Sequence, residues 1–165
     1  MKKETMRLFI KQKAFSWRDR FYIKDENGND RYYAEGEGFS WVKKLHLYDL
    51  EGKKVAYFEQ KAWSWMPKYR IYRNGEFVAL IRREFTFLRP KYTLEGPGWS
   101  VDGSFWAHDY AIYAQGHQIA TVKKEWFTWG DSYVLDISDG WNEVLALSIV
   151  LVIDCVEEQD AAAST

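Results

Sequence analysis

The residues that could do chemistry are few, and the sequence does not gather them. The chain holds three histidines and one cysteine in 165 residues. His46, His108 and His117 show no spacing typical of metal ligands, and a nucleophilic cysteine must be accessible and in an electropositive setting. Cys155 instead falls within an apolar run, which favours a buried structural role. We therefore expect no catalytic residue, no metal and no cofactor.

Two further patterns suggest catalysis, but each has a simpler interpretation. His108-Asp109 could be an acid/base pair, yet it falls in an expected connector, where a solvated polar turn is more common. Asp102-Gly103-Ser104 is typical of a turn rather than of a nucleophile elbow. The glycines are spread one to a turn, so no glycine-rich phosphate loop is present. The sequence thus predicts that the protein is not an enzyme.

The elements that must position these residues come from a pattern repeated six times. Each copy has an aromatic, then four or five places later an aromatic or aliphatic residue, and an aliphatic residue two places further on. Repetition at about 20–24 residues indicates one supersecondary unit used again and again. The copies are Trp17…Phe21-x-Ile23, Trp41…Leu45-x-Leu47, Trp65…Tyr69-x-Ile71, Phe87…Tyr92-x-Leu94, Trp106…Tyr110-x-Ile112 and Trp129…Tyr133-x-Leu135.

Each unit is expected to be two strands, because apolar residues recur with a period of two. Gly52, Gly75 and Gly116 mark the hairpin turns that join the strands. A change of parity between the sixth and eleventh residues after Gly52 and Gly116 predicts a β-bulge there, which the Gly75 unit lacks. Six such units predict an all-β fold, a twelve-stranded antiparallel barrel closed to avoid exposed edges.

The C-terminal stretch Val144–Val156 is apolar on every side and predicts a helix at about 142–157, with Asp139 as its N-cap. It is too short to cross a bilayer of about 30 Å. A twelve-stranded barrel has room for one helix, so we expect the helix inside it. The expected organisation is a single domain over residues 1–158, with strands over about 6–137 and a disordered tail at 159–165.

Composition limits the partners and the compartment. A net charge of −1 argues against a dedicated nucleic-acid binder, which is usually strongly basic. A single cysteine excludes an intramolecular disulfide and favours a reducing cytoplasm. The residues before Leu8 include no apolar signal segment, and no run is long enough for a transmembrane span.

Segregated charge is the strongest functional signal. In an up-and-down barrel the six Trp-to-Tyr connectors share one rim, and the first four carry charges that sum to +6, whereas the last two, with His108-Asp109 and Asp131, sum to −2. The opposite rim is richer in acid. The predicted ligand-binding residues are Arg18, Arg20, Lys43, Lys44, Lys68, Arg89 and Lys91.

These basic residues favour a non-catalytic module that recognises an anionic ligand, with phospholipid headgroups at a membrane surface as the preferred class. A ring of Trp17, Trp41, Trp65 and Trp129 beside them could meet lipid, although such a ring more often caps a core. Charged connectors are also simply solvated in most barrels. The alternative function is a cytoplasmic protein–protein interaction module.

The chain resembles the LURP-one-related branch of the tubby C-terminal-like superfamily, which is common among small bacterial proteins. The resemblance lies in Phe15–Asp25, Gly75–Arg83, Trp99–Gly103, Gly130–Leu135 and the apolar end. It implies twelve strands around a C-terminal helix, an architecture shared with phospholipid scramblases. Tubby domains bind phosphoinositides, but none of their ligand residues matches a position here. The resemblance therefore implies the fold and leaves the ligand open.

Overall fold

Twelve strands precede one helix in the residues that the computed structural model describes, namely 5–11, 20–37, 41–84, 86–88, 91–127 and 130–164. The strands are β1 Thr5–Lys11, β2 Phe21–Lys24, β3 Asp30–Gly36, β4 Lys44–Asp49, β5 Lys54–Gln60, β6 Lys68–Arg73, β7 Glu76–Glu84, β8 Lys91–Glu95, β9 Trp99–Ser104, β10 Asp109–Ala114, β11 His117–Phe127 and β12 Gly130–Ser138. The helix is α1, Glu143–Ala163.

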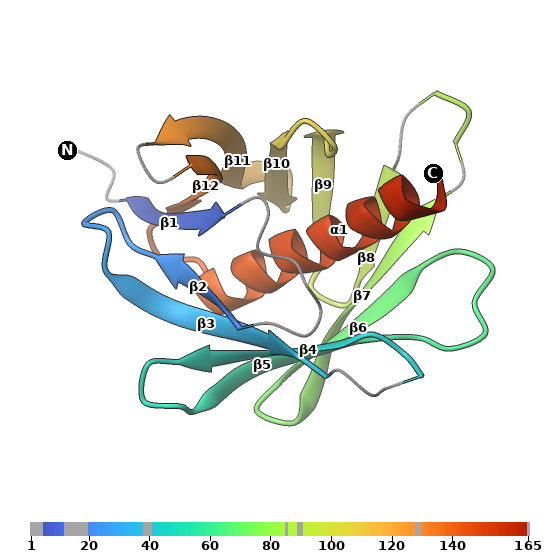
Figure 1. Ribbon diagram of the computed structural model, residues 1–165. Coiled ribbons are helices and arrows are strands. Elements are labelled where there is room, and N and C mark those ends of the chain that lie inside the picture. The colour runs from blue at the N-terminus through green and yellow to red at the C-terminus, as the bar shows by residue number, and fades with distance from the viewer. Residues whose placement is uncertain are drawn as a thin grey trace.

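All twelve strands belong to one antiparallel sheet that curls around α1 (Figure 1). Except for β8 and β9, strands that are consecutive in sequence are neighbours in the sheet, and β1 joins the two halves by pairing with both β2 and β12. β8 and β9 end the hydrogen-bonded order and lie against each other without a ladder. The barrel is therefore nearly closed, which confirms the predicted fold class.

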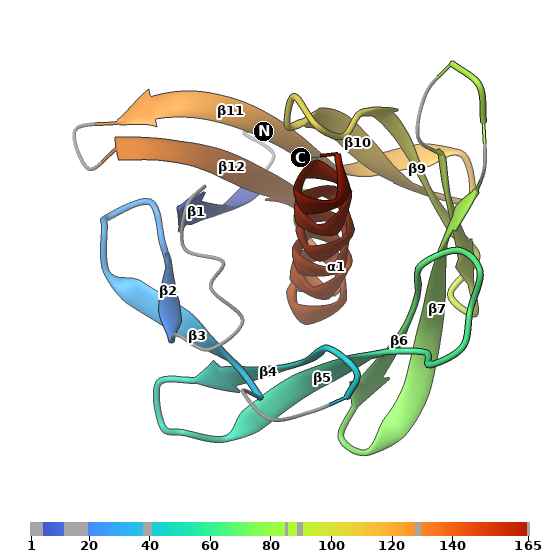
Figure 2. The ribbon, with the colours of Figure 1, turned by 45° about the vertical axis from the view of Figure 1, so that its right-hand side comes forward.

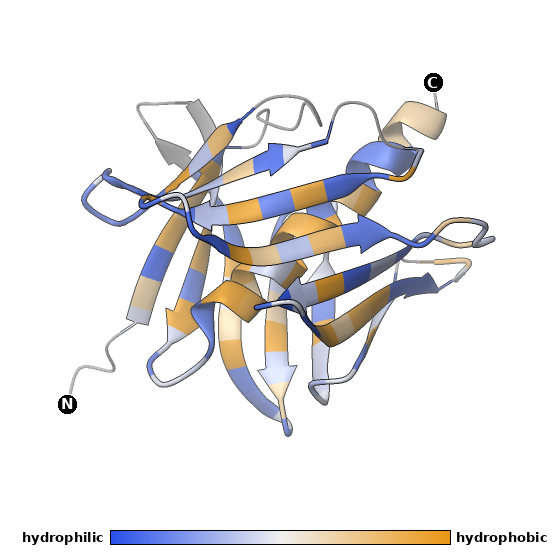
Figure 3. Ribbon diagram, turned by 90° about the horizontal axis from the view of Figure 1, so that it is seen from below, coloured by the Kyte–Doolittle hydropathy of each residue, from blue (hydrophilic) through white to orange (hydrophobic). Residues whose placement is uncertain are grey.

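Alternation along the strands decides which side chains fill the barrel. In β4, Leu45 and Leu47 are buried while His46 and Tyr48 lie on the outer face, and apolar and polar residues alternate along most strands (Figure 3). Two-residue turns such as Asn74-Gly75, with φ values of 50° and 79°, supply the left-handed backbone that a tight hairpin requires.

The β-bulges lie closer to the turn glycines than the parity of the sequence suggested. Each of the three repeats has one extra residue, at Val55, Val78 or Ile119, three places after its glycine. β11 pairs with β12 without a shift from Ala120 to Phe127, so the bulge predicted there is wrong. A bulge sets two residues against one, which explains why each repeat has two adjacent apolar residues in contact with the core.

The helix fills the barrel, as its end-on view in Figure 2 shows. Val144–Val156 is buried throughout, and the helix backbone comes closest to β5 and β12. Asn142, not the predicted Asp139, is the N-cap, because its Oδ1 accepts the N–H of Leu145 at 3.0 Å. Asp139 instead accepts the N–H of Gly140 in the preceding turn, at 2.8 Å.

The helix also continues beyond its predicted end, so that residues expected in a disordered tail are helical as far as Ala163. Contacts with the barrel wall hold this extension in place. The side chain of Gln159 donates to the Tyr69 hydroxyl at 2.9 Å, and Asp160 pairs with Arg83.

Gly103 lies inside β9 rather than in a turn, so the prediction of a turn at Asp102-Gly103-Ser104 is wrong. Its φ is 138°, and a Cβ there would stand 2.5 Å from the Cα of Tyr110 on β10. Glycine is required because the two strands approach too closely for a side chain.

Candidate functional site

The two ends of the barrel differ. The end at which β1, β3, β5, β7, β9 and β11 finish, and at which β2, β4, β6, β8, β10 and β12 start, is called here the connector rim. α1 ends at this rim, since Asp154 contacts His108 in the β9–β10 connector and Asp160 contacts Arg83 near the end of β7. α1 begins at the opposite end, called the hairpin rim, where Glu143 contacts Arg31. The ends of the strands that flank the six connectors thus lie together, as an up-and-down order requires.

The predicted basic residues stand at regular intervals around the connector rim. Arg18 and Arg89 lie outside the described residues. The other five begin or directly precede alternate strands, β2, β4, β6 and β8, which are about 10 Å apart. They form an arc suited to an extended surface rather than a pocket around one small anion. These five are Arg20, Lys43, Lys44, Lys68 and Lys91.

Two of these cations are partly neutralised on the outer face of the barrel. Arg20 pairs with Glu35 at 3.4 Å and lies 4.5 Å from the centre of the Tyr33 ring. Lys44 pairs with Glu37 at 3.5 Å. Exposed pairs of this kind stabilise little and exchange readily, so both side chains can still contribute positive potential.

The remaining cations differ in exposure. Lys91 is 67% exposed and forms a third, longer ion pair, with Glu84 at 3.9 Å. Lys43 is half-buried, and burial lowers the pKa of its ammonium group while nearby Glu158 and Cys155 oppose that effect. Lys68 is partly buried at the start of β6. Lys91 is therefore the most exposed of these three side chains, while Lys68 is partly covered and Lys43 is influenced by Glu158 at the end of α1.

Large apolar side chains project from the same rim, a feature that the basic residues alone did not reveal. Phe87, Leu88 and three tryptophans are exposed over at least 95% of their surface, and Trp106 over 73%. The expectation that the tryptophan ring caps the core is wrong for Trp41 and Trp65, while Trp17 and Trp129 lie outside the described residues. The projecting residues are Trp41, Trp63, Trp65, Phe87, Leu88 and Trp106.

The end of α1 adds acid to the connector rim, which the sequence pattern did not predict. Glu157 accepts a hydrogen bond from the Tyr92 hydroxyl at 2.5 Å, and Asp160 pairs with Arg83. Burial raises the pKa of Glu158 to about 6, with Asp154 adding to the effect and Lys43 opposing it. The last turn of the helix has no basic residue. The rim therefore combines a basic arc with an acidic centre.

His108 is not the solvated turn residue that the sequence suggested. Its ring stacks on Tyr133 at 4.4 Å between centroids, its Nε2 lies 3.1 Å from Asp154, and its side chain is 12% exposed. The Tyr133 hydroxyl donates to the other oxygen of Asp154. Burial raises the pKa of Asp154, although the His108 hydrogen bond opposes this shift. A contact across 46 residues leaves no local trace in the sequence.

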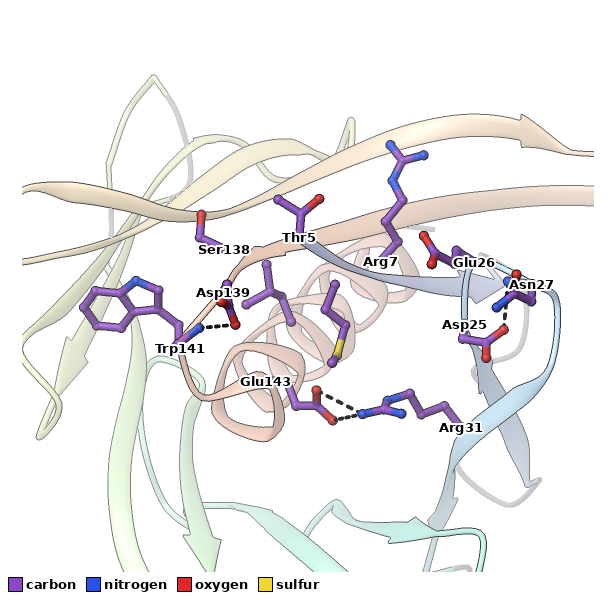
Figure 4. A pocket seen from close by; sticks show the side chains of 13 residues that line it. Thr5, Arg7, Asp25, Glu26, Asn27, Arg31, Ser138, Asp139, Trp141 and Glu143 are labelled. Carbon is purple, nitrogen blue, oxygen red and sulfur yellow. Dashed lines mark hydrogen bonds and ion pairs between the residues drawn. The ribbon is translucent and has the colours of Figure 1, made fainter. Parts of the chain in front are cut away.

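A polar hollow of about 450 Å³ lies at the hairpin rim, and the arginines that line it are paired with carboxylates (Figure 4). Arg31 is the extra residue of a bulge in β3, and it reaches Glu143 at 2.9 and 3.2 Å. Arg7 pairs with Asp136 at 2.6 Å. Both arginines that line the hollow are therefore held by carboxylates, and the hollow is better explained as closure between α1 and the barrel.

The described residues offer no group of three or more metal-ligating side chains. Cys155 is fully buried, and burial raises the pKa of its thiol well above the ordinary value. Among the described elements, no helix has the length and apolarity to cross a membrane.

A twelve-stranded antiparallel barrel, nearly closed around a C-terminal helix, defines the tubby-like class of fold. Within that class the chain belongs to the LURP-one-related (LOR) family, whose model matches residues 6–154. It is 34% identical over 153 residues to the uncharacterized protein YxjI of Bacillus subtilis (strain 168), covering 93% of this chain and 94% of YxjI.

The fold is also similar to the X-ray structure of the Arabidopsis thaliana protein AT5G01750. The TM-score is 0.68 with 17% sequence identity, over 93% of this chain and 92% of that one. At this identity the similarity establishes the shared fold and leaves the ligand open.

Proposed function

We propose that the chain is a non-catalytic module that docks on anionic phospholipid surfaces through its connector rim. The observation that carries this proposal is the set of six large apolar side chains projecting from successive connectors of one rim. Monomeric proteins rarely expose such groups together without a partner. Tryptophan in particular favours the interface between headgroups and acyl chains.

The basic arc supplies the preference for anionic lipid. Each lysine or arginine near such a surface contributes about 1 kcal/mol, and the effect falls off within a Debye length. The carboxylates at the end of α1 subtract from this attraction, because Glu157, Glu158 and Asp160 lie on the same rim. Binding is therefore expected to be weak, reversible and sensitive to salt. The six projecting apolar side chains, called here the apolar tips, should provide the part of the binding free energy that salt does not remove.

The non-catalytic part of the proposal has its own support. The cysteine is buried with a raised pKa, and His108 is engaged with Asp154 and Tyr133 inside the mouth of the barrel. α1 fills the interior, which leaves little volume there for a substrate.

An interaction module for a protein partner is the alternative function, and a separate observation favours it. Aromatic rings cross the outer face of β3 to β6 in mutual contact, with centroids 4.9 Å apart for Tyr33 and Tyr48 and 5.7 Å apart for Tyr57 and Tyr72. Rigid aromatic side chains of this kind are enriched at protein interfaces.

Vesicle co-sedimentation of the full chain separates these two functions. We expect binding to vesicles of phosphatidylcholine with phosphatidylglycerol, reduced by high salt, and little binding to phosphatidylcholine alone. Trp41→Ser with Trp65→Ser should weaken binding, whereas Leu50→Ser with Phe77→Ser, at exposed apolar positions outside the connector rim, should not.

A charge-reversed pair tests the basic arc in the same assay. Lys68→Glu with Lys91→Glu should abolish the preference for anionic vesicles, and Lys53→Glu with Lys54→Glu, at the hairpin rim, should leave it largely intact. Absence of any preference for anionic lipid at low salt would remove the membrane function and leave the protein-interaction module as the leading alternative.

A further inference from the structure

A pocket of about 370 Å³ opens at the mouth of the barrel, between the β9–β10 connector and the last turns of α1. Its wall on the connector side is formed by the exposed Trp106 and by His108. Its wall on the helix side carries the carboxylates of Asp154, Glu157, Glu158 and Asp160. The pocket thus places an aromatic face opposite a concentration of negative charge.

The negative charge of this pocket is incompletely balanced by the described residues around it. Arg83 pairs with Asp160, and Lys43 is the cation that acts on Glu158. His108 contacts Asp154. The helix terminus adds partial negative charge of its own, and its last turn has no basic residue to offset it. A cation entering the pocket would relieve this excess.

A buried hydroxyl near the carboxylates of the pocket is also left without a partner. Tyr110 is 4% exposed, and its hydroxyl has no hydrogen-bond partner among the described residues. Its electrostatic neighbours are Asp154 and Glu157 of the pocket, together with Tyr92. Buried hydroxyl groups are normally satisfied, so this hydroxyl, which can donate as well as accept, shows that hydrogen bonding near the carboxylates of the pocket is incomplete.

We propose that this pocket binds a primary ammonium group, with Trp106 covering it by a cation–π contact and Glu157 and Glu158 accepting its N–H donors. A primary ammonium has three donors and no acceptor, which suits a site made almost entirely of acceptors. The inference rests on the proposed function for one source of the ligand, the ethanolamine headgroup of a membrane that meets the connector rim. A free primary amine presents the same chemistry.

Titration of the full chain with ethanolamine hydrochloride tests the pocket without a membrane. The expected result is a saturable shift of the Trp106 indole N–H resonance, absent with sodium chloride at equal ionic strength and absent at Trp141. Glu157→Gln with Glu158→Gln should weaken binding at least about tenfold, and Trp106→Ala about two- to fivefold. The matched pair Glu51→Gln with Glu76→Gln, exposed near the other rim, should change nothing.

Vesicles then distinguish failure of the pocket from failure of the proposed function. Adding phosphatidylethanolamine to phosphatidylglycerol vesicles should strengthen binding of the parent chain and not of the Glu157/Glu158 variant. Vesicle binding without a saturable ethanolamine response overturns the pocket and leaves the membrane function standing. A saturable response without vesicle binding supports the pocket as a site for free amines and overturns the membrane function.

Discussion

Asp154 is the only charged residue in the buried stretch Val144–Val156, and its neighbours explain how the fold holds it. A buried carboxylate is costly unless hydrogen bonds satisfy it. His108 approaches one of its oxygens from the β9–β10 connector, and Tyr133 approaches the other from β12. The backbone of His108 has a φ of 49°, a left-handed conformation that few non-glycine residues adopt. The connector is therefore bent to bring the imidazole to Asp154.

The first prediction concerns this contact. His108→Asn should lower the free energy of unfolding by about 1–3 kcal/mol, because asparagine tolerates the left-handed backbone but its shorter side chain leaves Asp154 with one partner fewer. Urea denaturation measures the loss. Asp109→Asn is the control, since Asp109 is exposed and should be nearly silent. Equal effects of the two substitutions would contradict a structural role for His108.

The second prediction concerns Glu158, whose pKa of about 6 lies above its ordinary value of 4.5. The folded protein therefore binds a proton more tightly than the unfolded chain, and the stabilising contribution of this group is lost as the pH rises from 4.5 to 6. Glu158→Gln should therefore raise the free energy of unfolding at pH 7.5 by on the order of 1 kcal/mol after solvent screening, and with it the melting temperature.

Thermal melts in amine-free buffer at pH 4.5 and 7.5 check this sign. At pH 4.5 the variant and the parent chain should differ little. Glu76→Gln, an exposed matched substitution, should be neutral at both values. Stabilisation by Glu158→Gln that is larger at the lower pH would contradict the assignment.

At the scale of elements, the repeats identified strands and turns well because the alternation and the turn glycines are local signals. Bulges were misplaced because an extra residue changes the parity of the pattern but does not mark its own position. The three bulges sit beside the turns, where Val55, Val78 and Ile119 precede the alanines of the repeats. The tight hairpin and the bulge together set the twist of the wall.

The helix was predicted as an element but not in its full length. Its apolar stretch is visible in the sequence, whereas the polar residues after Glu157 interrupt that apolar pattern and predict an end to the helix. Long-range partners extend it instead, since Arg83, Tyr69 and Tyr92 come from strands remote in sequence and satisfy the side chains of the last turns. The pattern of one sequence does not reveal these contacts between side chains far apart along the chain.

The third prediction tests the helix as the core of the barrel. Leu151 is fully buried, so Leu151→Asp should place an unpaired charge in the core and cost several kcal/mol, enough to leave the chain insoluble or molten. Near-UV circular dichroism and denaturant unfolding report the loss. Ala163→Asp, an exposed position on the same helix, should preserve a cooperative transition. A soluble, cooperatively folded Leu151→Asp variant would exclude the buried-helix arrangement in solution.

At the scale of the whole molecule, the barrel separates two kinds of end. Acidic residues of the hairpin rim stabilise the turns. Asp25 and Asp49 each accept hydrogen bonds from two backbone N–H groups of their own turns, at 2.9–3.0 Å. The connector rim instead carries exposed tryptophans and lysines that no turn requires. Charge counting along the sequence located the basic arc, but it could not show the apolar tips, because exposure of a connector residue depends on the assembled barrel.

The last prediction follows from this polarity of the molecule. In a Cys155→Ala background, which removes the single thiol, a polarity-sensitive fluorophore is attached to Ser64→Cys between two exposed tryptophans, or to Glu51→Cys at the hairpin rim. Anionic vesicles should shift the emission of the Ser64 label to the blue and raise its intensity, because that connector enters the interface. The Glu51 label should keep the emission of an aqueous environment. A blue shift at Glu51 without one at Ser64 would reverse the orientation and refute docking through the connector rim.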